Sequence, residues 1–261
     1  GAAARASAGT AAGAEAEAAV AAAAWWRGRV WALARDPQGC RALQDELGRS
    51  SLPAAARADL VAELRGRVAE GVRCPQANFV LQKCVTMCSA EEVQFIVDEI
   101  AARGPGAISQ VARHKYGCRI VQRLLEAIPS ERLRKLTQGL LTHARDCSLD
   151  MYGNYVMQHL VEHGTPQQRA RMAAILRGCI GKLEGVESRP LWAVISKALT
   201  FCGTDDKVEL AHRIRCDKGT LKELHSLRLG RIIARRVAEI LDGQDSRGCR
   251  AIGLSAIIGG G

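Results

Sequence analysis

Apolar residues recur every three or four positions along most of the chain, in short runs separated by polar or glycine-containing breaks. Two clear runs are EEVQFIVDEIAA at residues 91–102 and QQRARMAAILRGCI at residues 167–180. This spacing places apolar side chains on one face of an α-helix. The chain has no long alternating run of polar and apolar residues and no Asn-Gly hairpin signal. The sequence therefore predicts an all-α protein without a sheet.

A short polar motif recurs inside the predicted helices. In MYGNYVMQHLVEHG, at residues 151–164, Asn154 and Gln158 lie one helical turn apart and Tyr155 flanks the first amide. Taken alone, such an amide pair is typical of a solvated helix surface. The last motif position recurs at residues 44, 82, 122 and 158, with steps of 38, 40 and 36 residues, which indicates an array of stacked repeats. The four motifs consist of Cys40, Arg41 and Gln44; Asn78, Phe79 and Gln82; Cys118, Arg119 and Gln122; and Asn154, Tyr155 and Gln158.

The same period predicts two further repeats near residues 196 and 234. Their apolar framework is retained, whereas the polar motif is lost. The equivalent positions are Trp192, Ala193 and Ser196 in PLWAVISKAL, and Gly230, Arg231 and Ala234 in LGRIIARRV.

A helix-start residue follows each of the first five motifs after seven or eight positions. Ser89 with Glu92, and Thr165 with Gln168, have the spacing of a capping box. Each repeat therefore contains at least two helices, and we expect an all-α solenoid in which each repeat buries its apolar face against its neighbours. The five helix-start residues are Ser51, Ser89, Ser130, Thr165 and Thr204.

The two ends of the chain differ in composition from the repeats. Residues 1–24 form an alanine-rich leader, residues 25–242 hold the expected repeat array and residues 243–261 form a glycine-rich tail. The apolar run at residues 18–26 is too short to span a bilayer, so we expect no membrane association. No convincing secretory signal is present, and three of the ten cysteines lie among apolar neighbours, which favours a reducing compartment and core positions for Cys84, Cys179 and Cys202.

Signatures of catalysis and of metal binding are absent from the sequence. It has no P-loop, no G-x-S-x-G and no H-E-x-x-H motif, so we expect no enzyme and no cofactor. His159 and His163 lie four residues apart, as do Cys84 and Cys88, but neither pair has a second pair at zinc-site spacing. We therefore expect no metal site.

A net charge of +10 and a pI near 9.4 favour a polyanionic partner, although solvated lysines and arginines give many proteins a similar charge. A row of motifs, one per repeat, is suited to a linear polymer. Amide side chains match the hydrogen-bonding edges of unstacked RNA bases, and Tyr, Phe and Arg match their faces. Single-stranded RNA is therefore the expected partner. In every repeat after the first, a basic residue follows the last motif position, either along the RNA backbone or as a solvated flank. These residues are Lys83, Arg123, His159, Lys197 and Arg235.

The segments NFVLQKCV, KYGCRIVQRLLE and MYGNYVMQHLVEHG resemble successive repeats of the Pumilio (PUF) family of RNA-binding proteins. The resemblance is most specific over residues 78–164 and extends from Trp25 to Leu241. It implies a crescent of three-helix repeats, of which this chain holds about six where the family has eight. It also implies a base code in which Asn with Gln specifies uracil, Cys with Gln specifies adenine, and the residue after the first one stacks on the base.

Carried over position by position, the resemblance implies stacking by Arg41, Phe79, Arg119 and Tyr155. Because the family binds RNA antiparallel, the four motifs imply the sequence 5′-U-A-U-A-3′. Trp192 either stacks on a base or packs in the core, and Ser196 and Arg231 are further candidates for RNA contact. The residues expected to contact base edges are Cys40, Gln44, Asn78, Gln82, Cys118, Gln122, Asn154 and Gln158.

The resemblance implies post-transcriptional regulation of mRNA in the cytoplasm, by a monomer that binds 3′ untranslated regions and recruits regulatory proteins. Two alternatives remain open. A degenerate PUF-like protein that binds structured RNA during ribosome assembly would account for the lost motifs around Trp192 and Gly230. A protein-binding scaffold of the HEAT or armadillo kind would share the helical architecture, but it gives no reason for the recurrence of the polar motif.

Overall fold

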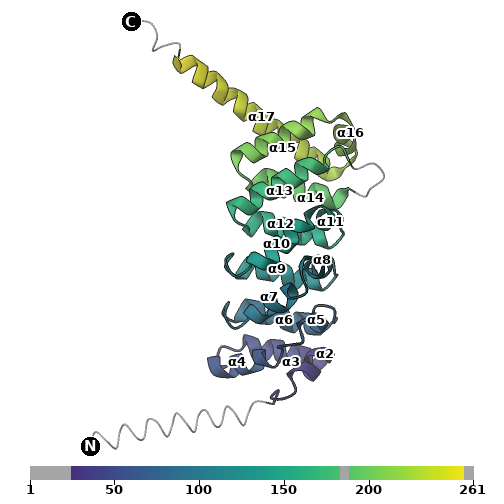
Figure 1. The fold of residues 1–261 in the computed structure, drawn as a ribbon, viewed down its shortest axis with the longest axis vertical. Coiled ribbons are helices and arrows are strands. Elements are labelled where there is room, and N and C mark those ends of the chain that lie inside the picture. The colour runs from purple at the N-terminus through teal and green to yellow at the C-terminus, as the bar shows by residue number, and fades with distance from the viewer. Residues whose placement is uncertain (1–24, 183–187, 256–261) are drawn as a thin grey trace, which may run out of the picture. The chain divides into compact units, whose positions relative to one another are not determined.

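The computed structural model of the chain describes residues 25–182 and 188–255, and every regular element in these ranges is a helix. The expected all-α class is confirmed. The described residues fall into two compact units, one that ends at Ala102 and one that begins at Arg103. The elements of each unit are drawn in Figure 1.

The first unit contains two repeats of three helices each. In both, a short first helix precedes a middle helix that carries the motif, and a third helix follows. The middle helices α3 and α6 pack against each other, and α5 packs on α7. The helices are α2 (Val30–Arg35), α3 (Pro37–Gly48), α4 (Ala54–Ala62), α5 (Val68–Gly71), α6 (Ala77–Met87) and α7 (Gln94–Ala101).

The second unit continues the same plan. Its middle helices α9, α12, α14 and α17 pack in succession, and the third helices α10, α13 and α15 do the same behind them (Figure 1). Each repeat therefore buries apolar surface against the next one. The helices are α8 (Pro105–Ala112), α9 (Gly117–Ala127), α10 (Arg134–Thr142), α11 (Ala144–Leu149), α12 (Gly153–His163), α13 (Pro166–Cys179), α14 (Arg189–Phe201), α15 (Thr204–Cys216), α16 (Lys218–Ser226) and α17 (Arg228–Ser255).

The predicted capping box at Thr165 is present at the start of α13. The Thr165 hydroxyl accepts a hydrogen bond from the Gln168 amide at 3.3 Å, and the Gln168 side chain accepts one from the Thr165 amide at 2.9 Å. The Thr165 cap satisfies backbone donors that have no partner inside the helix. The Ser89 and Glu92 pair makes the same exchange at 3.3 and 2.7 Å, but in the turn before α7, which begins only at Gln94.

A second marker of the period lies at the start of the repeats. Gly28 and Gly66 adopt positive φ angles of 70° and 77°, which favour glycine. Each is the second residue of an RGRV sequence. Their amides donate to Glu63 and Glu99, respectively, at 2.6 and 2.7 Å. Each carboxylate thus fixes the entry into the first helix of its own repeat.

The expectations for the cysteines and chain ends have different outcomes. Cys84, Cys179 and Cys202 are buried, as predicted. The predicted leader, residues 1–24, lies outside the described residues, and α17 continues past the predicted array boundary at residue 242 to Ser255. Across the described ranges, no helix combines the length and the apolar composition that crossing a membrane requires.

Candidate functional site

The structure places all four motifs at the same position, in the first turns of the middle helices α3, α6, α9 and α12. The residue before the motif lies close to the end of the preceding short helix. A Cβ atom on Gly117 would lie 2.6 Å from the Val111 carbonyl oxygen, and one on Gly153 would lie 2.6 Å from that of Cys147. Glycine therefore lets the middle helix start in van der Waals contact with the short helix, which fixes the position of the motif residues that follow.

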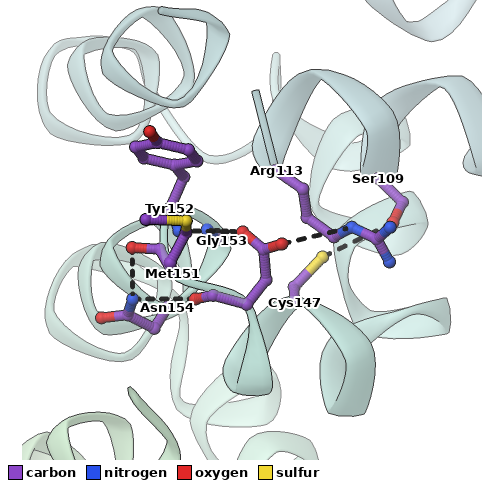
Figure 2. Close-up of polar contacts among 8 residues, drawn as sticks. Ser109, Arg113, Cys147, Met151, Tyr152, Gly153 and Asn154 are labelled. Carbon is purple, nitrogen blue, oxygen red and sulfur yellow. Dashed lines mark hydrogen bonds and ion pairs between the residues drawn. The ribbon is translucent and has the colours of Figure 1, made fainter. Parts of the chain in front are cut away.

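The two asparagine motifs have the same hydrogen bonds. The Asn154 side-chain nitrogen donates to the carbonyl oxygens of Asp150 and Met151 at 2.9 and 3.0 Å, and its oxygen accepts from Gln158 Nε2 at 2.9 Å. Figure 2 shows Asn154 reaching back to Met151. Both hydrogens of the Asn154 amide are thus used, whereas Gln158 retains one N–H and its Oε1 for another partner.

The same arrangement is built in the first unit around Asn78. Its side-chain nitrogen donates to the carbonyl oxygens of Cys74 and Pro75, both at 2.8 Å, and its oxygen accepts from Gln82 Nε2 at 2.8 Å. Asn78 and Asn154 are both buried, and Gln82 and Gln158 are both half-buried. In each motif the asparagine therefore orients the half-buried glutamine.

A side chain four positions before the first residue of each motif caps the start of the middle helix. It accepts a hydrogen bond from the backbone amide of the residue that precedes the motif. Asp150 Oδ1 accepts from the amides of Tyr152 and Gly153, both at 2.8 Å, and the Arg113 guanidinium lies 3.8 Å from its other oxygen (Figure 2). Sequence reasoning missed this series, although it has the spacing of the motifs. Its members are Asp36, Cys74, His114 and Asp150.

The second cysteine motif leaves a buried donor without a partner. Cys118 occupies the asparagine position, donates its thiol to the Lys115 carbonyl at 3.5 Å and has its pKa raised by burial. Its sulfur is only a weak acceptor, and it does not take the hydrogen bond that asparagine takes from glutamine in the other motifs. Gln122 Nε2 is consequently buried with no hydrogen-bond partner, while its Oε1 accepts weakly from Arg119 at 3.5 Å. An unmet buried donor costs about 1–3 kcal/mol, so the Gln122 amide gains if it turns toward a ligand that accepts from it.

In the first cysteine motif, a hollow lies beside the polar residues. Gln44 Nε2 donates to the Cys40 carbonyl and sulfur, both at 3.2 Å, and burial raises the pKa of the Cys40 thiol. The hollow has a volume of about 410 Å³ and lies between the predicted stacking residues of the two repeats. Its lining consists of Pro37, Cys40, Arg41, Gln44, Pro75, Gln76 and Phe79.

The predicted stacking residues are exposed. The side chains of Phe79 and Tyr155 are 50% and 47% exposed, which is unusual for large aromatic residues, and Arg41 and Arg119 are also exposed. The Arg119 guanidinium lies 5.8 Å from the centre of the Tyr155 ring in the neighbouring repeat. Flat groups from successive repeats of the second unit are therefore adjacent, as a stacked ligand requires.

Of the two interpretations of Trp192, the structure supports packing in the core over contact with RNA. Its side chain is fully buried, and its Nε1 donates to the Glu223 carboxylate on α16 at 3.0 Å. The indole ring fills the space that Asn or Cys occupies in the other repeats. Ser196 is half-buried and Ala193 has no ring, so the α14 repeat provides neither an edge-reading pair nor a stacking group.

The register of the last repeat also differs from the prediction. Gly230 lies against the carbonyl of Leu224, six residues earlier, as Gly153 lies against that of Cys147. Gly230 therefore precedes the motif, whose three positions are Arg231, Ile232 and Arg235, and not Gly230, Arg231 and Ala234. Ile232 is 61% exposed at the stacking position, like Phe79 and Tyr155. The fixed step of 38 residues was one residue too short here.

The expected basic line is largely neutralised in the second unit. Arg123 pairs with Glu126 at 2.6 Å, and the Lys197 amine pairs with Glu162. His159 lies 3.0 Å from Glu126, and burial lowers its pKa, so it carries little positive charge at neutral pH. Arg123 is thus paired within α9 and Lys197 is paired across to α12, which favours the solvated-flank interpretation over phosphate contacts.

Comparisons with known proteins match this geometry. The model of the Pumilio-family RNA binding repeat matches residues 29–50, 74–101, 108–141 and 143–176, each containing one motif. Relatives include Pumilio domain-containing protein C6G9.14 of Schizosaccharomyces pombe, 28% identical over 181 residues, and Fem-3 mRNA-binding factor 2 of Caenorhabditis elegans, 26% identical over 161 residues. These alignments cover 69% and 56% of this chain but only 25% and 24% of the relatives.

A solved structure shows the same fold. The Puf3 RNA binding domain bound to the Cox17 RNA 3′ UTR recognition sequence site B superimposes with a TM-score of 0.70, at 21% identity, over 82% of this chain and 63% of that one. The chain belongs to the Pumilio family of helical repeat proteins.

Proposed function

We propose that this chain binds single-stranded RNA in a sequence-specific manner, through the motif residues of α3, α6, α9 and α12. The observation that carries the proposal is the repeated amide pair. Asn78 with Gln82, and Asn154 with Gln158, have the same hydrogen bonds to within 0.2 Å, beside an exposed aromatic ring in each case. A solvated surface has no need to orient an amide with this precision.

Each asparagine motif reads one uracil. The free Oε1 of Gln158 accepts from the uracil N3–H, and its remaining N–H donates to a neighbouring carbonyl oxygen of the base. Tyr155 stacks on the base face, which contributes roughly 1–3 kcal/mol. Gln82 and Phe79 act in the same way on a second uracil.

Each cysteine motif reads one adenine. The unpartnered Nε2 of Gln122 donates to adenine N1, and its Oε1 accepts from the exocyclic amine. The small Cys118 leaves room for the purine. In the first unit, Gln44 performs the same role, and the hollow beside Arg41 and Phe79 accommodates a base.

Antiparallel binding, which the family resemblance implies, orders these bases as 5′-U-A-U-A-3′. The chain acts by binding and not by catalysis, in the post-transcriptional regulation of cytoplasmic mRNA. Support comes from the names of its relatives, one of which is an mRNA-binding factor, and from a structural neighbour bound to a 3′ UTR sequence. We further propose that it acts as a monomer which recruits regulatory proteins, with its repeat array over residues 25–242.

Selection from a random RNA pool tests this proposal. We expect a UAUA element to be enriched, with binding that survives moderate salt. Enrichment by shape or charge alone would support a role with structured RNA, as in ribosome assembly. No retained RNA would support a protein-binding scaffold instead, and either result would overturn sequence-specific reading.

Replacing Gln122 with leucine separates the ligand role from a structural one. We expect the free energy of unfolding to stay the same or rise, because the buried Nε2 donor has no protein partner to lose. RNA affinity should fall by about 1–3 kcal/mol, with loss of discrimination for adenine. Urea unfolding and fluorescence anisotropy measure the two quantities. The control is Gln138→Leu, at an exposed position of α10. Lower stability with unchanged affinity would make Gln122 structural.

Two variants of the last repeat test its corrected register. On RNA with two nucleotides added 5′ to UAUA, Ile232→Ala should weaken binding by about 1 kcal/mol, because a stacking surface is lost. Ala234→Ser should be silent, because Ala234 lies between motif positions. The added nucleotide next to UAUA, which would lie at the α14 repeat, should be replaceable by any base without a change in affinity. A strong effect of Ala234→Ser with none of Ile232→Ala would restore the register predicted from the fixed step.

A further inference from the structure

Three metal-binding side chains converge where α9 and α12 end. His159 and His163 lie one turn apart on α12, with ring centres 5.7 Å apart and planes inclined by 22°. Glu126 comes from the last turn of α9, in the preceding repeat. One potential ligand atom from each of the three residues lies within 4.8 Å of the other two. The histidine pair that lacked a partner in the sequence thus acquires a carboxylate from the neighbouring repeat.

The contact between His159 and Glu126 has the spacing of two metal ligands. Their atoms Nδ1 and Oε1 are 3.0 Å apart, yet Nδ1 is buried and forms no hydrogen bond of acceptable geometry. Two ligand atoms bound to one tetrahedral zinc ion, with bonds of about 2.0–2.1 Å, lie roughly 3.3 Å apart. Little movement is therefore needed for both atoms to bind one ion.

The surroundings orient these ligands toward a cation. Arg123 holds Oε2 of Glu126 at 2.6 Å, which leaves Oε1 directed at His159, as a supporting residue does in metal sites. The Lys197 charge is compensated by Glu162. Both helices also direct the negative ends of their dipoles here, since α9 ends at Ala127 and α12 at His163.

We propose that Glu126, His159 and His163 bind a divalent transition-metal ion of the zinc class, with a fourth position open to water. Two imidazoles and one carboxylate form a donor set that suits zinc and disfavours calcium and magnesium, which prefer oxygen ligands. The ion joins the α9 repeat to the α12 repeat. The proposal is independent of RNA binding, because none of its ligands is a motif residue.

Titration of the chelator-treated full chain with Co²⁺, followed by absorption, tests the site. We expect visible bands of a four- or five-coordinate ion without thiolate-to-cobalt charge transfer, because no cysteine takes part. His163→Ala and Glu126→Gln should each weaken binding at least about tenfold, since even supporting residues contribute that much to metal affinity. His212→Ala, at an exposed position of α15, is the matched control and should bind as the parent does.

Thermal unfolding with and without Zn²⁺ gives a second readout. Zn²⁺ should raise the Tm of the parent and of His212→Ala, because an ion that binds the native state stabilises it, and should leave His163→Ala unchanged. Unchanged Co²⁺ affinity in both ligand variants would overturn the proposal. So would a thiolate charge-transfer band that persists in them, which would place the ion on cysteines.

Discussion

Replacing Trp192 with alanine is expected to lower the free energy of unfolding by about 3–5 kcal/mol, the usual cost of truncating a fully buried tryptophan. The indole is inaccessible to solvent and occupies the motif position of α14. Its loss creates a cavity and removes a donor from the Glu223 carboxylate. Urea unfolding followed by circular dichroism measures the change.

The same variant should bind UAUA RNA with the parent's affinity under conditions in which it remains folded. Trp25→Ala is the matched control, because Trp25 is 42% exposed and its truncation should cost little stability. A Trp192→Ala variant that keeps its stability and loses RNA affinity would show that the indole contacts RNA after all.

The period of the fold could be predicted from the sequence because it is set by local packing that every repeat shares. The motif residues follow a close contact between two helices, and the same contact recurs at each repeat. In three of the first four repeats the residue in that contact is glycine, namely Gly39, Gly117 and Gly153. Counting from this glycine, and not from a fixed step, would have placed the last motif at Arg231. The RGRV copies at residues 27–30 and 65–68 offered a second marker.

Two features of the site depend on contacts between distant segments and could not be predicted. Buried Trp192 donates to Glu223 on α16, and His159 lies beside Glu126 on α9. Nothing in the sequence around Trp192 or His159 identifies these partners. The pairing of Lys197 with Glu162 is decided in the same way, whereas Arg123 pairs with Glu126 on its own helix. Both pairings neutralise residues that the pattern of basic positions had assigned to a phosphate-binding line.

The amide pairs show how the fold prepares its surface for a ligand. In α12, the carbonyls of Asp150 and Met151 fix the orientation of Asn154, and Asn154 fixes that of Gln158. The glutamine is therefore held before any base arrives, so binding costs less side-chain entropy. Base identity then depends on which groups this glutamine leaves free, and changing those groups should change the base.

The double variant Asn154→Ser with Gln158→Glu should reverse the preference at one base, so that 5′-G-A-U-A-3′ binds better than 5′-U-A-U-A-3′. A carboxylate accepts from both the N1 and N2 donors of guanine, whereas uracil presents one donor between two carbonyl oxygens that repel it. Two hydrogen bonds to a base edge give about 1–3 kcal/mol of discrimination, so a preference of about tenfold is expected. Tyr155 is unchanged and continues to stack. Competition binding with the two RNAs measures the order.

The first unit supplies the matched control, because Asn78 and Gln82 have the same hydrogen bonds as Asn154 and Gln158. Asn78→Ser with Gln82→Glu should move the preference to 5′-U-A-G-A-3′ and leave the first base as uracil. Each double variant therefore reports on its own position only. If either variant loses affinity for all of these RNAs equally while its helix content is unchanged, its amide pair does not read that base. If both variants shift the same base, the assignment of one base to each repeat is wrong.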